Sequence, residues 1–236
     1  MMTQAKLTRG VPVWQGLLDP KFLPTNLVSA GNHLADAAKQ GDWPKVFMAL
    51  EDQQSLRPYQ WRLGGKSWFT VLHQAAWHGA SENVVDKLIK RGGIRSLRDA
   101  KGRIPFDVAQ ERGHHHLLKR LKPPPPPLSP YHLQELDMGL ADLVYGSLCP
   151  MSAHNHKVTK PSSSWREMLR YPPVEIMGEF RRQQLCFKMI GNDAVVRVTL
   201  NLGFLEVIMW SVETGESGLV HVVTRNDVIP VYGIFA

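Results

Sequence analysis

Apolar residues in the first half of the chain recur at the spacing of an α-helix, in short segments that end at glycine. Within residues 82–90 the aliphatic side chains stand three or four positions apart and share one helical face. They are Val84, Val85, Leu88 and Ile89. Gly92 and Gly93 follow, as expected at the left-handed position that commonly ends a helix. The pattern predicts an amphipathic helix over residues 82–90.

This pattern repeats at a nearly constant interval. Residues 72–76 (LHQAA) are matched 34 residues later by residues 106–110 (FDVAQ) and 38 residues earlier by residues 34–38 (LADAA). The same glycine follows each segment, as Gly41, Gly79 and Gly113. Each copy therefore predicts a short first helix, a glycine turn and a second amphipathic helix. The second helices are expected at residues 44–51, 82–90 and 114–121. Units that cannot bury their apolar face alone must stack on one another.

Two of these stretches, FTVLHQAAWHGASENVVDKLIKRGG and DAKGRIPFDVAQERGHHHLLKRL, resemble ankyrin repeats. The resemblance covers about residues 32–121, and the first copy keeps fewer of the motif positions. Val71 stands where the family has proline, Asp107 stands where it has histidine, and residues 80–81 lengthen the loop after the glycine. The 38-residue interval implies an insertion, SLRPYQWRLGGKSW, between the first two copies.

The resemblance implies a stack that binds proteins through its turn fingers and the concave face of its first helices, without catalysis of its own. It also implies a structural role for His73, bonded to backbone of a neighbouring turn. The alternative that Trp61 and Trp68 fill space inside the stack stays open. The implied contact residues on the concave face are Lys39, Gln40, Trp77, His78, Glu111 and Arg112. Those at the fingers are Arg57, Tyr59, Trp61, Arg62, Arg98, Lys101 and Arg103. Tryptophan, tyrosine and arginine are enriched at interface hot spots.

A run of prolines, residues 123–130 (PPPPPLSP), is expected to end the stack. Consecutive prolines form a stiff extended helix and cannot continue an α-helix, which favours a spacer. A second interpretation is that Arg120, Pro123 and Pro126 form a ligand for an aromatic-lined groove. The predicted domains are an N-terminal cap (1–31), a repeat domain (32–122), the linker (123–130) and a second domain (131–236). The expected cap residues are Trp14, Leu17, Leu18, Phe22 and Leu23.

Beyond the linker the hydrophobic period changes. Residues 129–148 predict one helix with Ser129 as N-cap, and its apolar face contains Leu133, Leu136, Leu140 and either Leu143 or Val144. Residues 165–180 (WREMLRYPPVEIMGEF) are expected to hold a short helix that ends at Pro172. Over residues 184–235, β-branched and aromatic runs alternate with turns and predict an antiparallel meander of four or five strands. The expected fold class is α+β, with an all-α stack first and an antiparallel sheet with covering helices second.

Charge is unevenly distributed along the chain. Up to Lys122 there are 19 Lys and Arg against 10 Asp and Glu, a net charge of +9, and the remainder has 9 against 11, a net charge of −2. A basic first half suggests an acidic partner, which is a protein patch, a nucleic acid or a membrane surface, and the alternative is a soluble surface that is basic without such a partner. No apolar run is long enough for a membrane span or a secretory signal. Two cysteines fit a reducing compartment, so a cytoplasmic location is expected.

Residues with catalytic or metal-binding chemistry are few and poorly spaced. Cys149, His154, His156 and Cys186 are ligand types for zinc, but they lack compact ligand spacing. Three consecutive histidines, residues 114–116, would point in different directions on a helix and cannot chelate one ion well. A catalytic set of Cys186, His221 and Asp227 rests on residue identity alone. Phosphate-binding, dinucleotide-binding and nucleophile-elbow motifs are absent from the sequence. No metal or cofactor is expected.

The sequence therefore favours a non-catalytic adaptor or regulator that captures an acidic protein surface with a basic stack. In this hypothesis the second domain makes another contact or dimerises through its sheet edge. Two alternatives remain. An enzyme would need a pocket with perturbed titratable groups in residues 123–236. A nucleic-acid-associated protein would need its basic residues to merge into a stripe, with binding that weakens steeply with salt.

Overall fold

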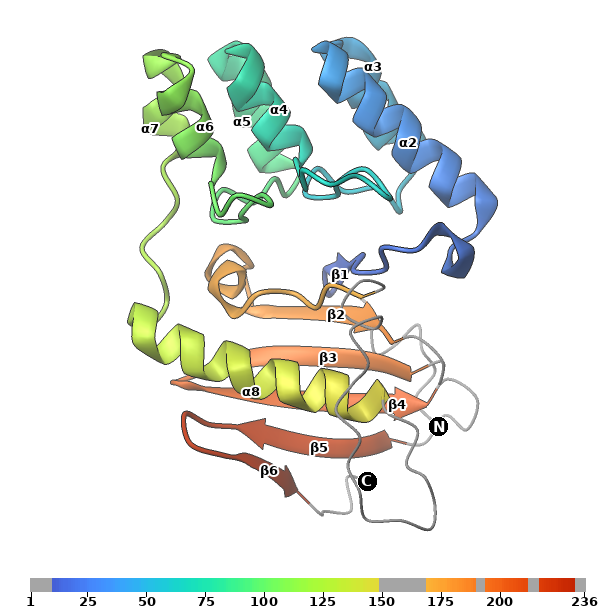
Figure 1. Cartoon of the computed structure of the whole chain (residues 1–236), viewed down its shortest axis with the longest axis vertical. Coiled ribbons are helices and arrows are strands. Elements are labelled where there is room, and N and C mark those ends of the chain that lie inside the picture. The colour runs from blue at the N-terminus through green and yellow to red at the C-terminus, as the bar shows by residue number, and fades with distance from the viewer. Residues whose placement is uncertain (1–9, 149–168, 190–193, 212–216, 232–236) are drawn as a thin grey trace. The chain divides into compact units, whose positions relative to one another are not determined.

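The computed structural model describes residues 10–148, 169–189, 194–211 and 217–231 of the 236-residue chain. Helices dominate the N-terminal part and strands the C-terminal part, so the fold class is α+β as predicted. The described residues form two compact units (Figure 1). The first, Asp19–Pro125, is called the helical unit. The second, called the sheet unit, consists of the described residues of Met1–Leu18 and Pro126–Ala236. The division lies within the proline run.

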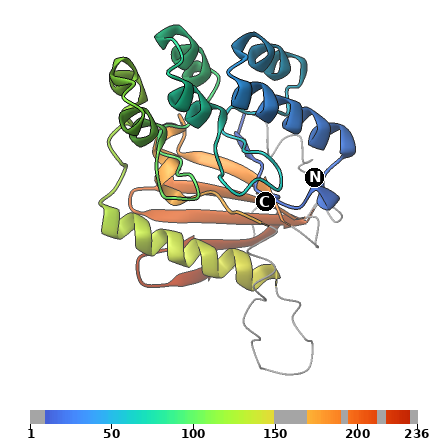
Figure 2. The same ribbon diagram turned by 45° about the horizontal axis from the view of Figure 1, so that its top comes forward.

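The helical unit consists of helix pairs that lie side by side (Figure 2). A 3₁₀ helix, η1 (Pro20–Phe22), precedes them. The pairs are α2 (Thr25–Gln40) with α3 (Trp43–Asp52), α4 (Val71–His78) with α5 (Glu82–Lys90), and α6 (Pro105–Glu111) with η2 (His115–Leu117) and α7 (Leu118–Leu121). The bounds of α5 are those predicted. The last predicted second helix is instead divided into a 3₁₀ turn and a single α-helical turn.

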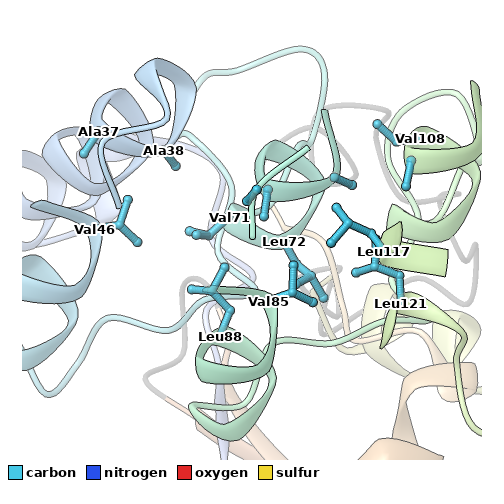
Figure 3. Packing of buried hydrophobic residues seen from close by; sticks show 14 of the residues in the cluster. Ala37, Ala38, Val46, Val71, Leu72, Val85, Leu88, Val108, Leu117 and Leu121 are labelled. Carbon is cyan, nitrogen blue, oxygen red and sulfur yellow. The ribbon is translucent and has the colours of Figure 1, made fainter. Parts of the chain in front are cut away.

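The helical unit is held together by one continuous apolar core (Figure 3). Ala75 and Ala76 of α4 are completely buried, and their small side chains allow neighbouring helices to approach closely. Leu72 is contributed by the same helix, while Val85 and Leu88 come from α5. Other core side chains include Leu34, Ala37, Ala38, Val46, Val71, Val108, Leu117 and Leu121. The stripe predicted for α5 therefore packs inward: Val85 and Leu88 are fully buried, and Val84 and Ile89 are partly buried against the same core.

His73 is the main polar group inside this core. Its Nδ1 accepts from the backbone N–H of Thr70 at 3.3 Å, which leaves the proton on Nε2. Nε2 then donates to the carbonyl oxygen of Arg103 at 3.1 Å. The Thr70 hydroxyl in turn caps α4 by accepting from the backbone N–H of His73. His73 therefore links the start of α4 to the turn before α6, and its predicted structural role is confirmed.

The sheet unit contains one six-stranded sheet in the order β1-β2-β3-β4-β5-β6. The strands are β1 (Val13–Trp14), β2 (Gln184–Lys188), β3 (Ala194–Asn201), β4 (Phe204–Ser211), β5 (Ser217–Val223) and β6 (Val228–Val231). Every pair from β2 to β6 is antiparallel, which confirms the predicted meander. β1 pairs with β2 in parallel, so the sheet is mixed.

Helix α8 (Pro130–Leu148) packs against one face of this sheet, on β4 and β5 (Figure 1). The Ser129 hydroxyl accepts from the backbone N–H of His132 at 3.3 Å, so Ser129 caps the helix as predicted. The predicted apolar face of α8 is buried through Leu133, Leu136, Leu140 and Val144. Residues paired across neighbouring strands lie on the same face of the sheet. Val196, Val198 and Leu200 of β3 supply buried side chains to the sheet core.

The structure differs from two sequence predictions for this unit. Trp14 and Leu17, expected in an N-terminal cap of the stack, belong to the sheet unit. The buried indole Nε1 of Trp14 donates to the carbonyl oxygen of Arg170 at 2.7 Å, and β1 extends the sheet. The short helix predicted before Pro172 lies largely outside the described residues; residues 169–171 are not helical, and the short helix that is described, the 3₁₀ helix η3 (Val174–Glu179), follows the prolines. Proline disfavours a helical conformation of the residue before it but is tolerated where a helix begins.

Candidate protein-interaction surface

The C-terminal ends of the first helices α2, α4 and α6 form the most distinctive exposed surface of the helical unit. Each helix contributes two of the residues implied by the sequence, and all six are exposed. They are Lys39 and Gln40, Trp77 and His78, and Glu111 and Arg112. Gly41 and Gly79 end α2 and α4 with φ of 73° and 60°, a conformation that residues with a Cβ rarely adopt.

Histidines tie these helix ends together. His78 Nε2 lies 2.9 Å from the carbonyl oxygen of Lys39, and His114 Nε2 lies 3.2 Å from the carbonyl oxygen of Trp77. Carbonyl groups in the last turn of a helix lack a partner within the helix, so each imidazole satisfies one of them. The Cβ of a residue replacing Gly79 would lie 2.6 Å from the His114 ring. The hydrogen bond from His78 to the carbonyl oxygen of Lys39 gives this exposed histidine a structural role as well.

Trp77 and Arg112 together form an exposed aromatic and cationic surface, which we call the Trp77–Arg112 patch. The Trp77 side chain is 38 % exposed, and the Arg112 guanidinium carbon lies 4.3 Å from the centre of its ring. Phe69 supports the indole in an edge-to-face contact at 6.2 Å. Such cation–π stacking orients the guanidinium but leaves its in-plane N–H donors available for a carboxylate. Sequence reasoning missed Phe69, because its contact with Trp77 bridges the start and end of α4.

Arg103, assigned to a turn finger, is instead the centre of a structural ion network. Its guanidinium donates to Asp99 at 2.8 and 3.0 Å and to Glu111 at 2.6 Å. Asp99 is buried and also accepts from the backbone N–H groups of Lys101 and Arg103. Burial raises the pKa of Asp99, but these bonds outweigh burial and lower it below the usual range. Because Arg103 holds Glu111, that carboxylate does not compete for Arg112 through an ion pair.

Three residues of the insertion that were assigned to the fingers have structural positions instead. Tyr59 and Trp61 are only 3 % and 7 % exposed, so they fill the interior, and burial raises the pKa of Tyr59 to about 12. The stack-filling alternative therefore describes Trp61. Arg57 is half-buried and donates to the carbonyl oxygens of Gln54 and Leu56. None of the three presents its full side chain to a partner.

The remaining finger residues are exposed. Arg62 forms an ion pair with Asp36 of α2, and Arg98 donates to the carbonyl oxygen of Gly102 at 3.0 Å. Lys101 follows Ala100, whose backbone N–H donates to Ser67 at 3.0 Å. That bond joins the turn before α6 to the insertion. The exposed finger residues are therefore basic, and a backbone hydrogen bond connects the two segments that carry them.

The acidic side chains of the helical unit are largely committed to internal contacts. Residues 19–125 contain 17 Lys and Arg against 10 Asp and Glu, a net charge of +7. Asp36, Asp42, Glu51, Glu82, Asp86, Asp99 and Glu111 form ion pairs, and Asp19 and Asp107 accept backbone N–H groups. Among described residues, no ion pair is found for the exposed side chains of Lys39, Lys66, Lys90, Arg112 and Lys119. The surface thus presents unneutralised positive charge.

The structure does not bring together the catalytic set considered for the sheet unit. Cys186 is paired across the sheet with Arg197, then Ile208, then Val220, whereas His221 pairs with Val207 and lies on the opposite face. The strands β2 and β5 are also three positions apart, about 14 Å at the usual spacing. Asp227 is exposed in a turn. Cys186 itself is buried, which raises its pKa to about 11.

The zinc interpretation is not supported by the part of the chain that can be described. Cys149, His154 and His156 lie outside the described residues. Within those residues, no group of three or more His, Cys, Asp or Glu side chains is arranged to hold a metal ion. His114 and His116 are instead bonded to the carbonyl oxygens of Trp77 and Ala80.

The sheet unit does contain titratable groups with shifted pKa values, at the junction of α8 and η3. Burial raises the pKa of Asp137, and burial lowers the pKa of Arg170 to about 10. The Asp137 carboxylate accepts from the Tyr171 hydroxyl at 2.7 Å and from the backbone N–H of Val174 at 2.9 Å. A cavity of about 420 Å³ in this unit has Arg181 and Arg182 in its wall and includes neither Asp137 nor Arg170. The geometry of Asp137 is that of a tether between α8 and η3.

No helix among the described residues is both long and apolar enough to cross a lipid bilayer. No protein-family model matches the chain, and no curated protein is significantly similar to it.

Proposed function

We propose that the helical unit is an ankyrin-like repeat stack and that the chain is a cytoplasmic, non-catalytic adaptor or regulator binding an acidic protein. The repeat interval in the sequence and the helix pairs that lie side by side support the first part of this proposal. Two cysteines in 236 residues, one of them a buried free thiol, are in keeping with a reducing compartment.

The observation that carries the proposal is the Trp77–Arg112 patch. The Trp77 side chain is 38 % exposed, and its contacts with Phe69 and Arg112 hold it in one orientation. The histidine bonds at the ends of α4 and α6 fix the backbone beneath it. A preorganised surface of tryptophan and arginine loses little side-chain entropy on binding, which is the property of interface hot spots.

The charge of the unit supports an acidic partner. Most of its described carboxylates are engaged in ion pairs or hydrogen bonds while lysine and arginine side chains stay exposed, and Glu111, the acidic residue next to Arg112, is paired with Arg103. Complementary charge raises the association rate and selects against basic partners. The adaptor would thus recognise acidic proteins by charge and hold them by the aromatic contact.

Affinity capture from the native host lysate, with and without nuclease, tests this function. Wild type is compared with Trp77→Ala/Arg112→Ala. The matched control, Phe22→Ala/Lys90→Ala, removes an exposed aromatic and an exposed cation elsewhere in the same unit. Truncation of one hot-spot side chain costs about 2 kcal/mol, roughly thirtyfold in Kd. We expect a protein that survives nuclease, is retained by the control and is lost from the patch variant.

Two other outcomes contradict the proposal. Retention of the same protein by the patch variant would place its binding site elsewhere on the chain. Loss of all capture after nuclease treatment would favour the nucleic-acid alternative, and binding to nucleic acid should then fall steeply as salt is raised. Circular dichroism of each variant distinguishes lost contacts from lost folding.

A further inference from the structure

A cavity of about 470 Å³ lies in the helical unit between α2, α4 and the insertion. Its volume is in the range of sites that take small ligands or single side chains. Trp61 and Phe69 provide apolar wall, while Gln74 provides a side-chain amide. Lys39 is also part of the wall, and it is one of the exposed residues implied as a contact by the sequence.

The insertion builds this cavity. Trp61 forms an isolated antiparallel bridge with Thr70, the N-cap of α4, so the insertion returns to the start of that helix. Trp68, between two residues of the cavity wall, has a φ of 54°. That left-handed conformation is uncommon for a bulky side chain, and residues held in it concentrate at binding sites. The insertion that lengthens the interval between the first two repeats therefore forms part of the cavity wall.

Charge defines what the cavity can hold. Asp36 and Arg62 both contribute to the wall and neutralise each other in an ion pair. Lys39 makes no ion pair with a described residue, so its ammonium group gives the wall a net positive charge. An ammonium group offers three donors and pairs best with a carboxylate. An amide such as that of Gln74 can donate to the same oxygen atoms.

The cavity is also adjacent to the Trp77–Arg112 patch. His78 Nε2 bonds the carbonyl oxygen of Lys39 at 2.9 Å, and Trp77 precedes His78 on α4. The positive wall of the cavity and the exposed indole are thus fixed on neighbouring helix ends. Phe69, whose ring contacts that of Trp77, also lines the cavity, so the indole and the cavity share a neighbouring residue.

We propose that this cavity is a recognition pocket for a glutamate or aspartate side chain of the partner protein, bound at Lys39 while an apolar residue of the same segment lies on Trp77. This inference rests on the function proposed above and specifies its partner as a segment that combines an acidic and an apolar residue. A free small carboxylate has the same chemistry and is tested separately.

Titration of the full chain with fluorescent peptides tests the pocket. The peptides carry one glutamate and one leucine separated by one to four residues, and a matched set has glutamine in place of glutamate. Wild type is compared with Lys39→Met and with Lys66→Met. Lys66 is exposed on the same insertion and does not line the cavity, so it controls for the loss of one charge. Free glutarate is titrated in parallel.

We expect a subset of the glutamate peptides to bind wild type and Lys66→Met equally, and to bind Lys39→Met about tenfold more weakly, as for one lost charge-assisted hydrogen bond. The glutamine peptides should not distinguish the three proteins. Equal weakening by both lysine variants would overturn the pocket in favour of general charge attraction. Lys39-dependent binding of glutarate without binding of peptides would overturn the partner as the source of the carboxylate.

Failure of this inference is separable from failure of the proposed function. If no glutamate peptide binds and a captured protein still depends on Trp77 and Arg112, the pocket is wrong and the adaptor stands. If capture is independent of Trp77 and Arg112, the adaptor surface is wrong whatever the peptides do.

Discussion

Replacing Asp99 with alanine should destabilise the helical unit more than any other removal of a carboxylate from it. The Asp99 side chain is almost completely buried and accepts four hydrogen bonds in the turn before α6. Two come from the guanidinium of Arg103 and two from the backbone N–H groups of Lys101 and Arg103. Alanine leaves all these donors without their acceptor.

The magnitude follows from the surroundings of Arg103. Breaking one side of a buried ion pair costs about 3–5 kcal/mol. Arg103 is partly accessible, with 18 % of its side chain exposed, and it keeps its bond to Glu111. Water can also reach the backbone of Lys101, which is exposed. The loss should therefore lie at the lower end, about 3 kcal/mol, which is a large share of the roughly 5–15 kcal/mol that stabilises a domain.

The effect depends on pH in a defined direction. The pKa of Asp99 is lowered in the folded state, so its contribution is complete above the unfolded value of about 3.9 and is lost as pH falls through the folded pKa. The difference between wild type and Asp99→Ala should thus be constant from pH 7 to about pH 5 and shrink below about pH 4.

Urea unfolding of the full chain, followed by far-ultraviolet circular dichroism, measures this loss. Asp52→Ala removes an exposed carboxylate of α3 and should change stability by less than about 0.5 kcal/mol. For a unit of this size, 3 kcal/mol corresponds to a midpoint shift of roughly 1–3 M urea. A loss below about 1 kcal/mol, or a difference that persists unchanged at pH 3, would refute the role given to Asp99.

Two further predictions concern packing. Gly79→Ala should lower thermal stability more than Gly113→Ala, because both glycines have positive φ but only a Cβ at position 79 meets the His114 ring, at 2.6 Å. If both variants lose the same stability, about 1 kcal/mol for the left-handed backbone, the His114 ring moves aside freely and the prediction is wrong. Cys186 should resist alkylation at pH 8 in the folded protein and react on unfolding, since burial raises its pKa to about 11. Peptide mass spectrometry measures this, and rapid modification of the folded protein would contradict it.

Local elements could be predicted because their signals lie within a few residues. The aliphatic stripe of α5 and the capping serine of α8 repeat or act over one or two helical turns. The strands from β2 to β6 follow one another along the chain, so turn residues between them were sufficient to indicate an antiparallel meander. The exposure of Trp77 and Arg112 was implied by the resemblance to ankyrin repeats, and both side chains are exposed.

Contacts between distant segments could not be predicted in this way. Sequence pattern alone did not indicate that Tyr59 and Trp61 turn inward, because a tryptophan beside arginine and glycine suits either a fingertip or an interior. Arg103 can bond both Asp99 and Glu111 only because the turn before α6 and the end of α6 are adjacent in space. The cavity at Lys39 exists only when the insertion is folded against α2 and α4.

The sequence by itself determined most of the helices, the strands from β2 to β6 and the uneven charge, since periodicity and capping are properties of a short stretch of backbone. Tertiary structure alone decided that Val13 and Trp14 join β2 as a parallel strand, although they lie at the opposite end of the chain. It also placed Cys186 and His221 on opposite faces of the sheet. The physical reason is that burial and pairing between remote segments depend on how the whole chain closes and packs, which no local pattern encodes.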